Sequence, residues 1–202
     1  MRIAIIGAGK VGTSLGSGWT GSGHDIVYGV RDPEDSRHAP LGSVETPADA
    51  VTGAEAVVIS LPWDATESVA RGLDVGGAVV IDATNPLAAG ARQLEGHHEL
   101  SGAQLVADWT GSSRVVKAFN TTGSGNMADP GYPGGTPAML LAGDDPDAKA
   151  LVASLARDLG FDAVDAGPLS AARDLEHLAM IWIRLAYPLG NGPDVAFSLL
   201  RR

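Results

Sequence analysis

Three glycines near the N-terminus have the spacing of a phosphate-binding turn. The apolar stretch 2–6 runs directly into Gly7-x-Gly9-x-x-Gly12, and residues 10–20 continue with a helical pattern. Gly7 allows a sharp turn with positive φ, Gly9 removes a side chain that would block a pyrophosphate, and Gly12 lets the helix pack closely on the strand. The first N–H groups and the positive dipole end of that helix then face the anion. Because the turn directly follows a strand, it favours dinucleotide binding over a purely structural glycine turn.

The end of the second predicted strand indicates which dinucleotide is bound. Residues 25–30 have the pattern of a strand, and Arg31 follows directly. Proteins that bind NAD place an Asp or Glu at this point for the ribose 2′-hydroxyl, whereas an Arg fits the 2′-phosphate of NADP. Arg31 therefore favours NADP(H), and Arg37 is a further candidate for a phosphate contact. Asp32 leaves an alternative open, because it could pair with Arg31 or turn back to a ribose.

Composition limits the classes of function. The chain has 202 residues, 45% of them hydrophobic, which is enough for one core with a small appendage. Its formal charge of −10, without a basic run, argues against nucleic acid as a partner. The absence of cysteine excludes disulfides, thiolate nucleophiles and thiolate metal sites. No run of about 18 apolar residues predicts a membrane span, and a strand that begins at Arg2 leaves no room for a signal peptide, so we expect a cytoplasmic protein.

The remaining patterns predict alternating strands and helices. The runs 56–61 and 78–82 are continuously apolar, as in parallel strands covered on both faces. Further strands are expected at 114–119, 138–142 and 163–166, and helices at 46–51, 65–73, 101–109, 145–159 and 170–187. We therefore expect an α/β fold, a Rossmann-type doubly wound and mostly parallel sheet. The NADP-binding domain would span 1–166, and a small helical and dimerising portion 167–202.

Ligands of such a sheet bind beyond the carboxyl ends of its strands. Leu61 and Pro62 end one strand and Thr84 and Asn85 follow the next, so we expect all four beside the glycine turn as cofactor contacts. Asn85 has an equally strong alternative as a turn residue before a proline. The Gly- and Pro-rich stretch 124–137 is predicted to be a mobile lid.

The histidines do not form a metal-binding pattern. His97 and His98 are adjacent, whereas helical ligands lie three or four residues apart, so a surface loop is expected there. Arg173 and His177 lie four apart on the last helix, away from its apolar face, where they meet a ligand or are solvated. The tail segment 195–200 is either an edge strand or a dimer contact.

Five short blocks spread over most of the chain resemble one family. They are Tyr28-Gly29-Val30-Arg31, Pro62-Trp63, Val115-Val116-Lys117-Ala118-Phe119-Asn120-Thr121, Gly143-Asp144-Asp145 and Asp165-Ala166-Gly167-Pro168-Leu169-Ser170. Together they resemble the NADPH-dependent reductases of the deazaflavin coenzyme F-420. That family is itself similar to the reductase domain of certain membrane metalloreductases. The resemblance implies a nucleotide-binding domain with a small C-terminal portion, and deazaflavin rings against the nicotinamide in the cleft.

The resemblance also implies roles for single residues. The pyrophosphate would be held by Gly7, Gly9, Lys10, Val11 and Gly12. Arg31 would bind the 2′-phosphate, and Leu61 and Pro62 would flank the ribose and nicotinamide. Asn120 and His177 fall in the pocket of the hydride acceptor, at positions where archaeal members carry a His and a small hydroxyl residue. Val30 replaces the usual Ser before the strand-end Arg, which removes one phosphate hydrogen bond.

The implied reaction is hydride transfer between NADP(H) and a deazaflavin. Because the two rings supply the chemistry, no side chain is expected to be catalytic, and Asn120 and His177 would orient the acceptor. An acidic protein would need arginines such as Arg114 or Arg173 near the cleft to hold a polyanionic deazaflavin tail. One alternative is a reductase of another acceptor: a flavin, a ferric chelate, or an imine or ketone, the last two needing a general acid. The other alternative is a domain that senses NADP(H) without catalysis.

Overall fold

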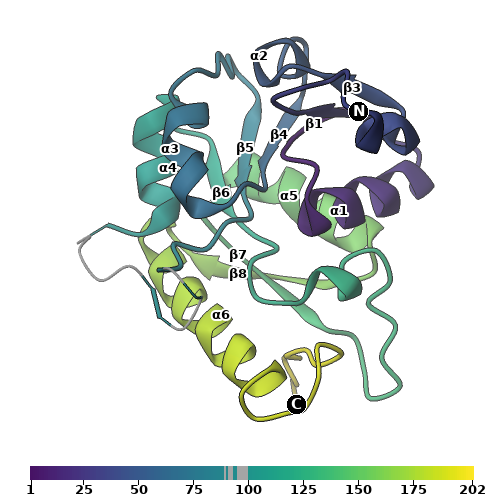
Figure 1. Cartoon of the computed structure of the whole chain (residues 1–202). Coiled ribbons are helices and arrows are strands. Elements are labelled where there is room, and N and C mark those ends of the chain that lie inside the picture. Colours follow the sequence, from purple (N-terminus) through teal and green to yellow (C-terminus); the bar gives the residue numbers. More distant parts are fainter. Residues whose placement is uncertain (89, 91–92, 95–99) are drawn as a thin grey trace.

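The centre of the molecule is one sheet of eight strands in the order β3-β2-β1-β4-β5-β6-β7-β8 (Figure 1). The structure is a computed structural model that describes residues 1–88, 90, 93–94 and 100–202. The first six strands in that order are parallel, β7 runs antiparallel to β6, and β8 is parallel to β7. The strands are β1 Arg2–Ile6, β2 Asp25–Gly29, β3 Ser43–Glu45, β4 Ala56–Ile59, β5 Val79–Asp82, β6 Val115–Lys117, β7 Ala138–Gly143 and β8 Asp162–Gly167.

Helices cover both faces of the sheet. They are α1 Lys10–Gly21, α2 Pro47–Ala50, α3 Trp63–Ala70, α4 Gly102–Thr110, α5 Pro146–Asp158 and α6 Ala172–Ala186. Alternate strand residues divide between two cores: Ile5 packs with residues of α1 and α5, whereas Ile6 packs with residues of α2, α4 and α6. Figure 1 shows α1 and α5 on one side of the strands and α3 and α4 on the other. This arrangement confirms the doubly wound Rossmann-type fold.

Several helices begin at residues whose side chains satisfy the first free N–H groups. The Thr46 hydroxyl accepts a hydrogen bond from the Asp49 N–H at 3.3 Å, and the Asp145 carboxylate accepts one from the Ala148 N–H at 2.7 Å. Proline occupies the first turn of both α2 and α5. Ser101 forms a capping box at the start of α4. These local contacts explain why the predicted starts of the three helices are confirmed.

The C-terminal portion shares the core of the sheet. Leu169, Ala172 and Leu175 belong to the same cluster of buried residues as Ile6 and Val57. The boundary that the sequence suggests at residue 166 stays a prediction. None of the helices in the described part of the chain is long and apolar enough to cross a bilayer.

Two parts of the chain differ from their expected shape. The strand expected at 114–119 ends at Lys117, because Phe119 has a φ of 61° and turns the backbone out of the sheet. The edge strand considered for 195–200 is wrong, since this segment is irregular. It is fixed instead by single contacts, in which the Ala138 N–H donates to the Phe197 carbonyl at 2.8 Å and the Trp182 indole donates to the Val195 carbonyl at 2.7 Å. The dimer contact stays a prediction.

The stretch expected to be a lid lies along α1. It begins with a short helix, η2 Ser124–Asn126, whose Ser124 carbonyl accepts a hydrogen bond from the Ser14 hydroxyl at 2.6 Å. Asn126 and Met127 are buried. The stretch 124–137 lines neither of the two cavities described below, so a role as a lid would need this packing to be released.

Candidate functional site

The glycine turn has the geometry that a bound pyrophosphate requires. Gly7 has a φ of 106°, and a Cβ atom at this position would lie 2.8 Å from the Ser60 carbonyl oxygen. A Cβ atom at Gly12 would overlap the Gly7 carbonyl oxygen, so the helix packs closely on the turn. Space is open only at Gly9, where a Cβ atom would have no neighbour within 4 Å among the described atoms. Gly9 is also the N-cap of α1 and has no side chain to accept from its first N–H groups. These groups therefore fit an anionic ligand.

Arg31 is exposed at the end of β2. The carboxylates beside it have other partners: Asp32 accepts a hydrogen bond from the Glu34 N–H at 3.2 Å, and Asp35 pairs with Arg37 at 2.7 Å. The backbone N–H of Arg37 holds the pKa of Asp35 below its usual value, and the guanidinium adds to this effect. The pairing of Asp32 with Arg31 considered from the sequence is not found among the ion pairs of the described residues. Arg31 is thus exposed and has no ion pair among the described residues, whereas Arg37 is engaged with Asp35, and a contact of Arg31 with a 2′-phosphate stays a prediction.

A cavity of about 500 Å³ lies at the carboxyl ends of β1, β4 and β5, and we call it the strand-tip cavity. Its described lining is Val11, Ser60, Leu61, Pro62, Trp63, Asp64, Ala83, Thr84, Asn85 and Leu87. Five of the predicted cofactor contacts come together here: Val11, Leu61, Pro62, Thr84 and Asn85. This is the switch point of the strand order, where β1 has β2 on one side and β4 on the other. Val11 places the cavity beside the glycine turn, where the nicotinamide end of a dinucleotide is expected.

Asn120 and Asn85 join the ends of β6 and β5. The Asn120 amide donates to the Asn85 side-chain oxygen at 3.0 Å, and the Asn85 amide donates to the Asn120 carbonyl at 3.1 Å. Asn120 also donates to the carbonyl of Leu175 in α6 at 3.1 Å. Its own side-chain oxygen is buried and has no donor among the described groups. The positive φ of Phe119, which is costly for a bulky residue, directs Asn120 into this network.

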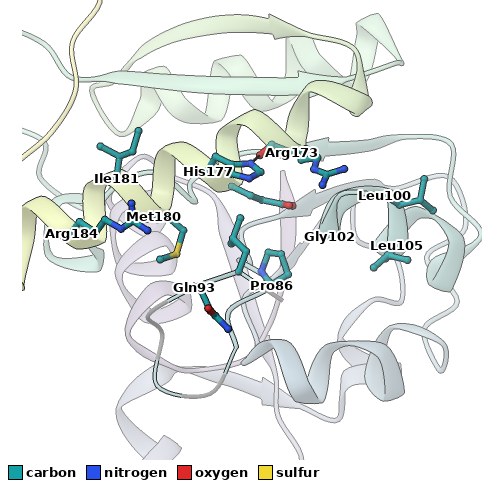
Figure 2. Close-up of a pocket in the computed structure, with 12 residues that line it drawn as sticks. Pro86, Gln93, Leu100, Gly102, Leu105, Arg173, His177, Met180, Ile181 and Arg184 are labelled. Atoms are coloured by element: carbon teal, nitrogen blue, oxygen red, sulfur yellow. Dashed lines mark hydrogen bonds between the residues drawn. The ribbon is translucent and has the colours of Figure 1, made fainter. Parts of the chain in front are cut away.

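His177 lies in a different cavity from the predicted cofactor contacts. Its Nδ1 lies 2.7 Å from the Arg173 carbonyl, and Figure 2 shows both side chains on α6, facing Pro86 and Gln93. The cavity has a volume of about 490 Å³, and we call it the α6 cavity. Its described lining is Pro86, Gln93, Leu94, Leu100, Gly102, Leu105, Arg173, Glu176, His177, Met180, Ile181 and Arg184.

The segment 85–87 separates the two cavities. Pro86 lines the α6 cavity, while Asn85 and Leu87 line the strand-tip cavity. The structure therefore does not place Asn120 and His177 in one pocket, because Asn120 bonds to the backbone of α6 and His177 lies exposed on that helix.

Other candidates from the sequence lie outside the site. Arg114 precedes β6, at the amino end of this strand and away from the carboxyl ends that line the cavity, and pairs with Asp145 at 3.8 Å, so it does not reach the cleft. His97 and His98 lie outside the described residues. Among the residues that are described, no three His, Cys, Asp or Glu side chains are grouped as metal ligands would be.

Comparison with known proteins shows the family to which the chain belongs. Residues 2–86, from β1 to the segment after β5, match the family model described as NADP oxidoreductase, coenzyme F420-dependent. A solved structure from Arthrobacter sp. FB24, provisionally named an F420-dependent NADP-reductase, is 30% identical with a TM-score of 0.88, and 100% of each chain is covered. The chain belongs to the F420-dependent NADP oxidoreductase family. It is an NADP-dependent oxidoreductase, and NADP(H) is its nicotinamide cofactor.

Other proteins are similar to this family member over most of its length. The rat metalloreductase STEAP3 is 29% identical over 182 residues, which is 89% of this chain. The chain spans only 36% of the length of that relative. An imine reductase from Streptomyces aurantiacus has a TM-score of 0.68 at 20% identity, covering 94% of this chain and 64% of its own, and so shares the fold.

A buried charge cluster, which the sequence patterns do not predict, lies beside the strand-tip cavity of this oxidoreductase. Lys117 in β6 has a fully buried side chain, and its ammonium lies 2.8 Å from the Asp82 carboxylate and 3.0 Å from that of Glu176. It also donates to the Thr84 carbonyl at 2.7 Å. Thr84 in turn donates to Asp82, from its hydroxyl at 2.7 Å and its N–H at 2.9 Å. A Lys within the apolar run 114–119 is the feature that could have revealed it, because a buried Lys needs a carboxylate partner.

The pKa values in this cluster shift for opposing physical reasons. Burial alone would lower the pKa of Lys117, but the carboxylates of Asp82 and Glu176 outweigh burial and raise it above its usual value. Burial raises the pKa of the Glu176 carboxyl, and the nearby charge of Asp82 adds to this, against the lowering effect of Lys117. Lys117 is therefore an ammonium that pairs with both carboxylates, and the pKa of the Glu176 carboxyl is raised above that of an ordinary Glu side chain.

Proposed function

We propose that this oxidoreductase transfers a hydride between NADP(H) and a deazaflavin of the coenzyme F-420 type, bound against the nicotinamide. The observation that carries the proposal is the character of the strand-tip cavity. Among the described residues that line it, Asp64 is the only ionisable one, and its side chain is exposed. Leu61, Pro62 and Leu87 offer apolar surface for flat rings. Such a site fits a reaction between two rings without an acid or base from the protein.

The chain's own groups bind and orient the cofactor and the acceptor. The turn at Gly9 and the start of α1 bind the pyrophosphate, and Arg31 binds the 2′-phosphate. Asn120 is held by Asn85 and by α6, so it fixes the side chain of Asn85, which lines the strand-tip cavity. When bound, the nicotinamide supplies the hydride and the deazaflavin ring accepts it, or the reverse. The protein contributes proximity and exclusion of water.

A second candidate acceptor is a flavin or a ferric chelate. It is favoured by the 29% identity to a metalloreductase over 89% of this chain. A reductase of imines or ketones is less well supported, because the described lining of the strand-tip cavity has no buried acid that could protonate the product.

The test is NADPH oxidation by the purified chain with four acceptors in parallel: the deazaflavin coenzyme, FMN, FAD and ferric citrate. We expect turnover with the deazaflavin to exceed that with the other three by at least about a hundred-fold in kcat/KM, which corresponds to about 3 kcal/mol of transition-state stabilisation. Preferred turnover of a flavin or the ferric chelate would replace the deazaflavin proposal by the second candidate. NADPH binding without turnover of any acceptor would contradict both.

A further inference from the structure

The buried charge cluster connects the two cavities. Thr84 lines the strand-tip cavity and Glu176 lines the α6 cavity. Lys117 lies between them and donates to both, to the Thr84 carbonyl at 2.7 Å and to the Glu176 carboxylate at 3.0 Å. The three groups come from β5, β6 and α6, so this contact also joins the last helix to the sheet. Neither the hydride transfer nor the binding of phosphates makes use of it.

We propose that Lys117 and Glu176 are positioning residues for the nicotinamide end of NADP(H): Lys117 fixes the Thr84 carbonyl in the strand-tip cavity, and Glu176 sets the charge of this contact by gaining or losing a proton at the α6 cavity. The inference goes beyond the proposed acceptor, because it concerns only how the cofactor is held. Its test therefore uses NADPH binding and does not depend on which acceptor is reduced.

The position of Thr84 depends on charge that is almost completely shielded from water. The side chains of Asp82 and Lys117 have no exposed surface, and that of Glu176 is 3% exposed. In such surroundings the free energy of an ion pair is large and an unpaired charge is costly. Asp82 holds the Thr84 hydroxyl and N–H, while Lys117 holds its carbonyl. A change in the charge of Glu176 therefore acts on the Thr84 carbonyl through a single residue, Lys117.

Glu176 is the member of the cluster through which a proton enters. It is the only one of the three acidic and basic groups that lines a cavity, and burial raises its pKa. The groups facing it from the packed elements are Lys117 in β6, Asp82 in β5 and the Gly102 N–H at the start of α4. On its own helix, Arg173, His177 and Arg184 line the same cavity, as Figure 2 shows. Ionised Glu176 adds a negative charge behind the site of a polyanionic cofactor and weakens its binding.

The main experiment compares the Kd of NADPH for the wild-type chain and for Glu176→Gln, by fluorescence titration from about pH 5 to about pH 9. Gln keeps the shape of the protonated carboxyl. We expect the wild-type Kd to approach that of the variant towards the acid end and to be about five-fold higher at the alkaline end. The 2′-phosphate titrates equally in both proteins and cancels in the ratio. A ratio that stays constant with pH would overturn the role of Glu176.

The matched control is Asp174→Asn, which removes the same charge from an exposed position on α6. The Kd of NADPH for this variant should stay within about two-fold of the wild-type Kd at every pH, because water screens an exposed charge. A pH-dependent ratio as large as that of Glu176→Gln would mean that the effect is general electrostatics of the helix, and would contradict the proposal.

A second variant tests Lys117 in the Glu176→Gln background, where removing the ammonium leaves only one buried carboxylate. Lys117→Met in this background should raise the Kd of NADPH about ten-fold, as expected for loss of one hydrogen bond to a charged donor. An unchanged Kd in the folded double variant would show that the contact with Thr84 is merely structural.

Discussion

Asn85 and Asn120 hold each other across the ends of two parallel strands, with hydrogen bonds of 3.1 and 3.0 Å running in opposite directions. The pair holds Asn85, which lines the strand-tip cavity, and Asn120 links it to the Leu175 carbonyl in α6. The Asn85 side chain bonds to another strand end, and its role as a cofactor contact stays a prediction.

We predict that Asn120→Ala lowers kcat/KM for the acceptor about ten-fold and the free energy of unfolding by about 1–3 kcal/mol, since it leaves the Asn85 side-chain oxygen and the Leu175 carbonyl without the Asn120 donor. Steady-state kinetics and denaturant unfolding measure the two effects. The control is Asn126→Ala, which removes a buried Asn that bonds to Thr122 and Pro193 instead. It should lower stability similarly without changing kcat/KM.

Two positions of the glycine turn are expected to affect different properties, one the affinity for NADPH and the other the free energy of unfolding. Gly9→Ala should weaken NADPH binding at least about ten-fold while changing the free energy of unfolding by less than about 1 kcal/mol, because its Cβ would enter only the space for the pyrophosphate. Gly12→Ala should instead lower the free energy of unfolding by about 1–3 kcal/mol, because its Cβ would meet the Gly7 carbonyl. Titration with NADPH and urea unfolding distinguish them. Normal NADPH affinity in Gly9→Ala would contradict the assignment of the turn.

Arg31 is the residue that we expect to set the preference for NADP(H) over NAD(H). We predict that Arg31→Ala raises the Kd of NADPH about 10–100-fold, the effect of losing charged hydrogen bonds to a phosphate, and leaves the Kd of NADH within about two-fold. Arg37→Ala is the matched control, because this guanidinium pairs with Asp35. An equal loss of NADPH affinity in both variants would show that the positive charge of this surface acts in general, and that Arg31 makes no specific phosphate contact.

His177→Ala tests whether the α6 cavity takes part in acceptor binding. The residue is exposed, so the variant should keep its stability within about 0.5 kcal/mol. Because the segment 85–87 separates the α6 cavity from the strand-tip cavity, we predict that the KM for the acceptor and the Kd of NADPH both stay within about two-fold of wild type. A KM for the acceptor raised about five-fold with an unchanged Kd of NADPH would show that the acceptor reaches the α6 cavity, and would contradict this separation.

The sequence was informative wherever the structure depends on neighbouring residues. The turn from Gly7 to Gly12, the Arg that follows β2 and the caps Thr46 and Asp145 are local motifs, and the apolar runs are long enough to indicate buried parallel strands. Together they determine the fold and the cofactor. The expected homodimer stays a prediction.

The missed features depend on contacts between distant parts of the chain. Lys117 meets Asp82 and Glu176, which are 35 and 59 residues away, and no local pattern indicates such partners. The strand β3 has three residues and so lacks a clear alternation. Phe119 adopts a positive φ that few bulky residues accept, which shortened the strand predicted there. Two cavities on either side of Pro86 are likewise a consequence of tertiary packing.

Direct transfer of hydrogen between the two rings is the central claim. The most direct measurement uses NADPH with deuterium at the nicotinamide C4, incubated with the chain and the oxidised deazaflavin, followed by mass spectrometry of the reduced product. The account predicts that the product carries the deuterium from one face of the nicotinamide, without exchange with water. A reduced deazaflavin that carries hydrogen from the solvent, or no reduced product although NADPH binds, would contradict it.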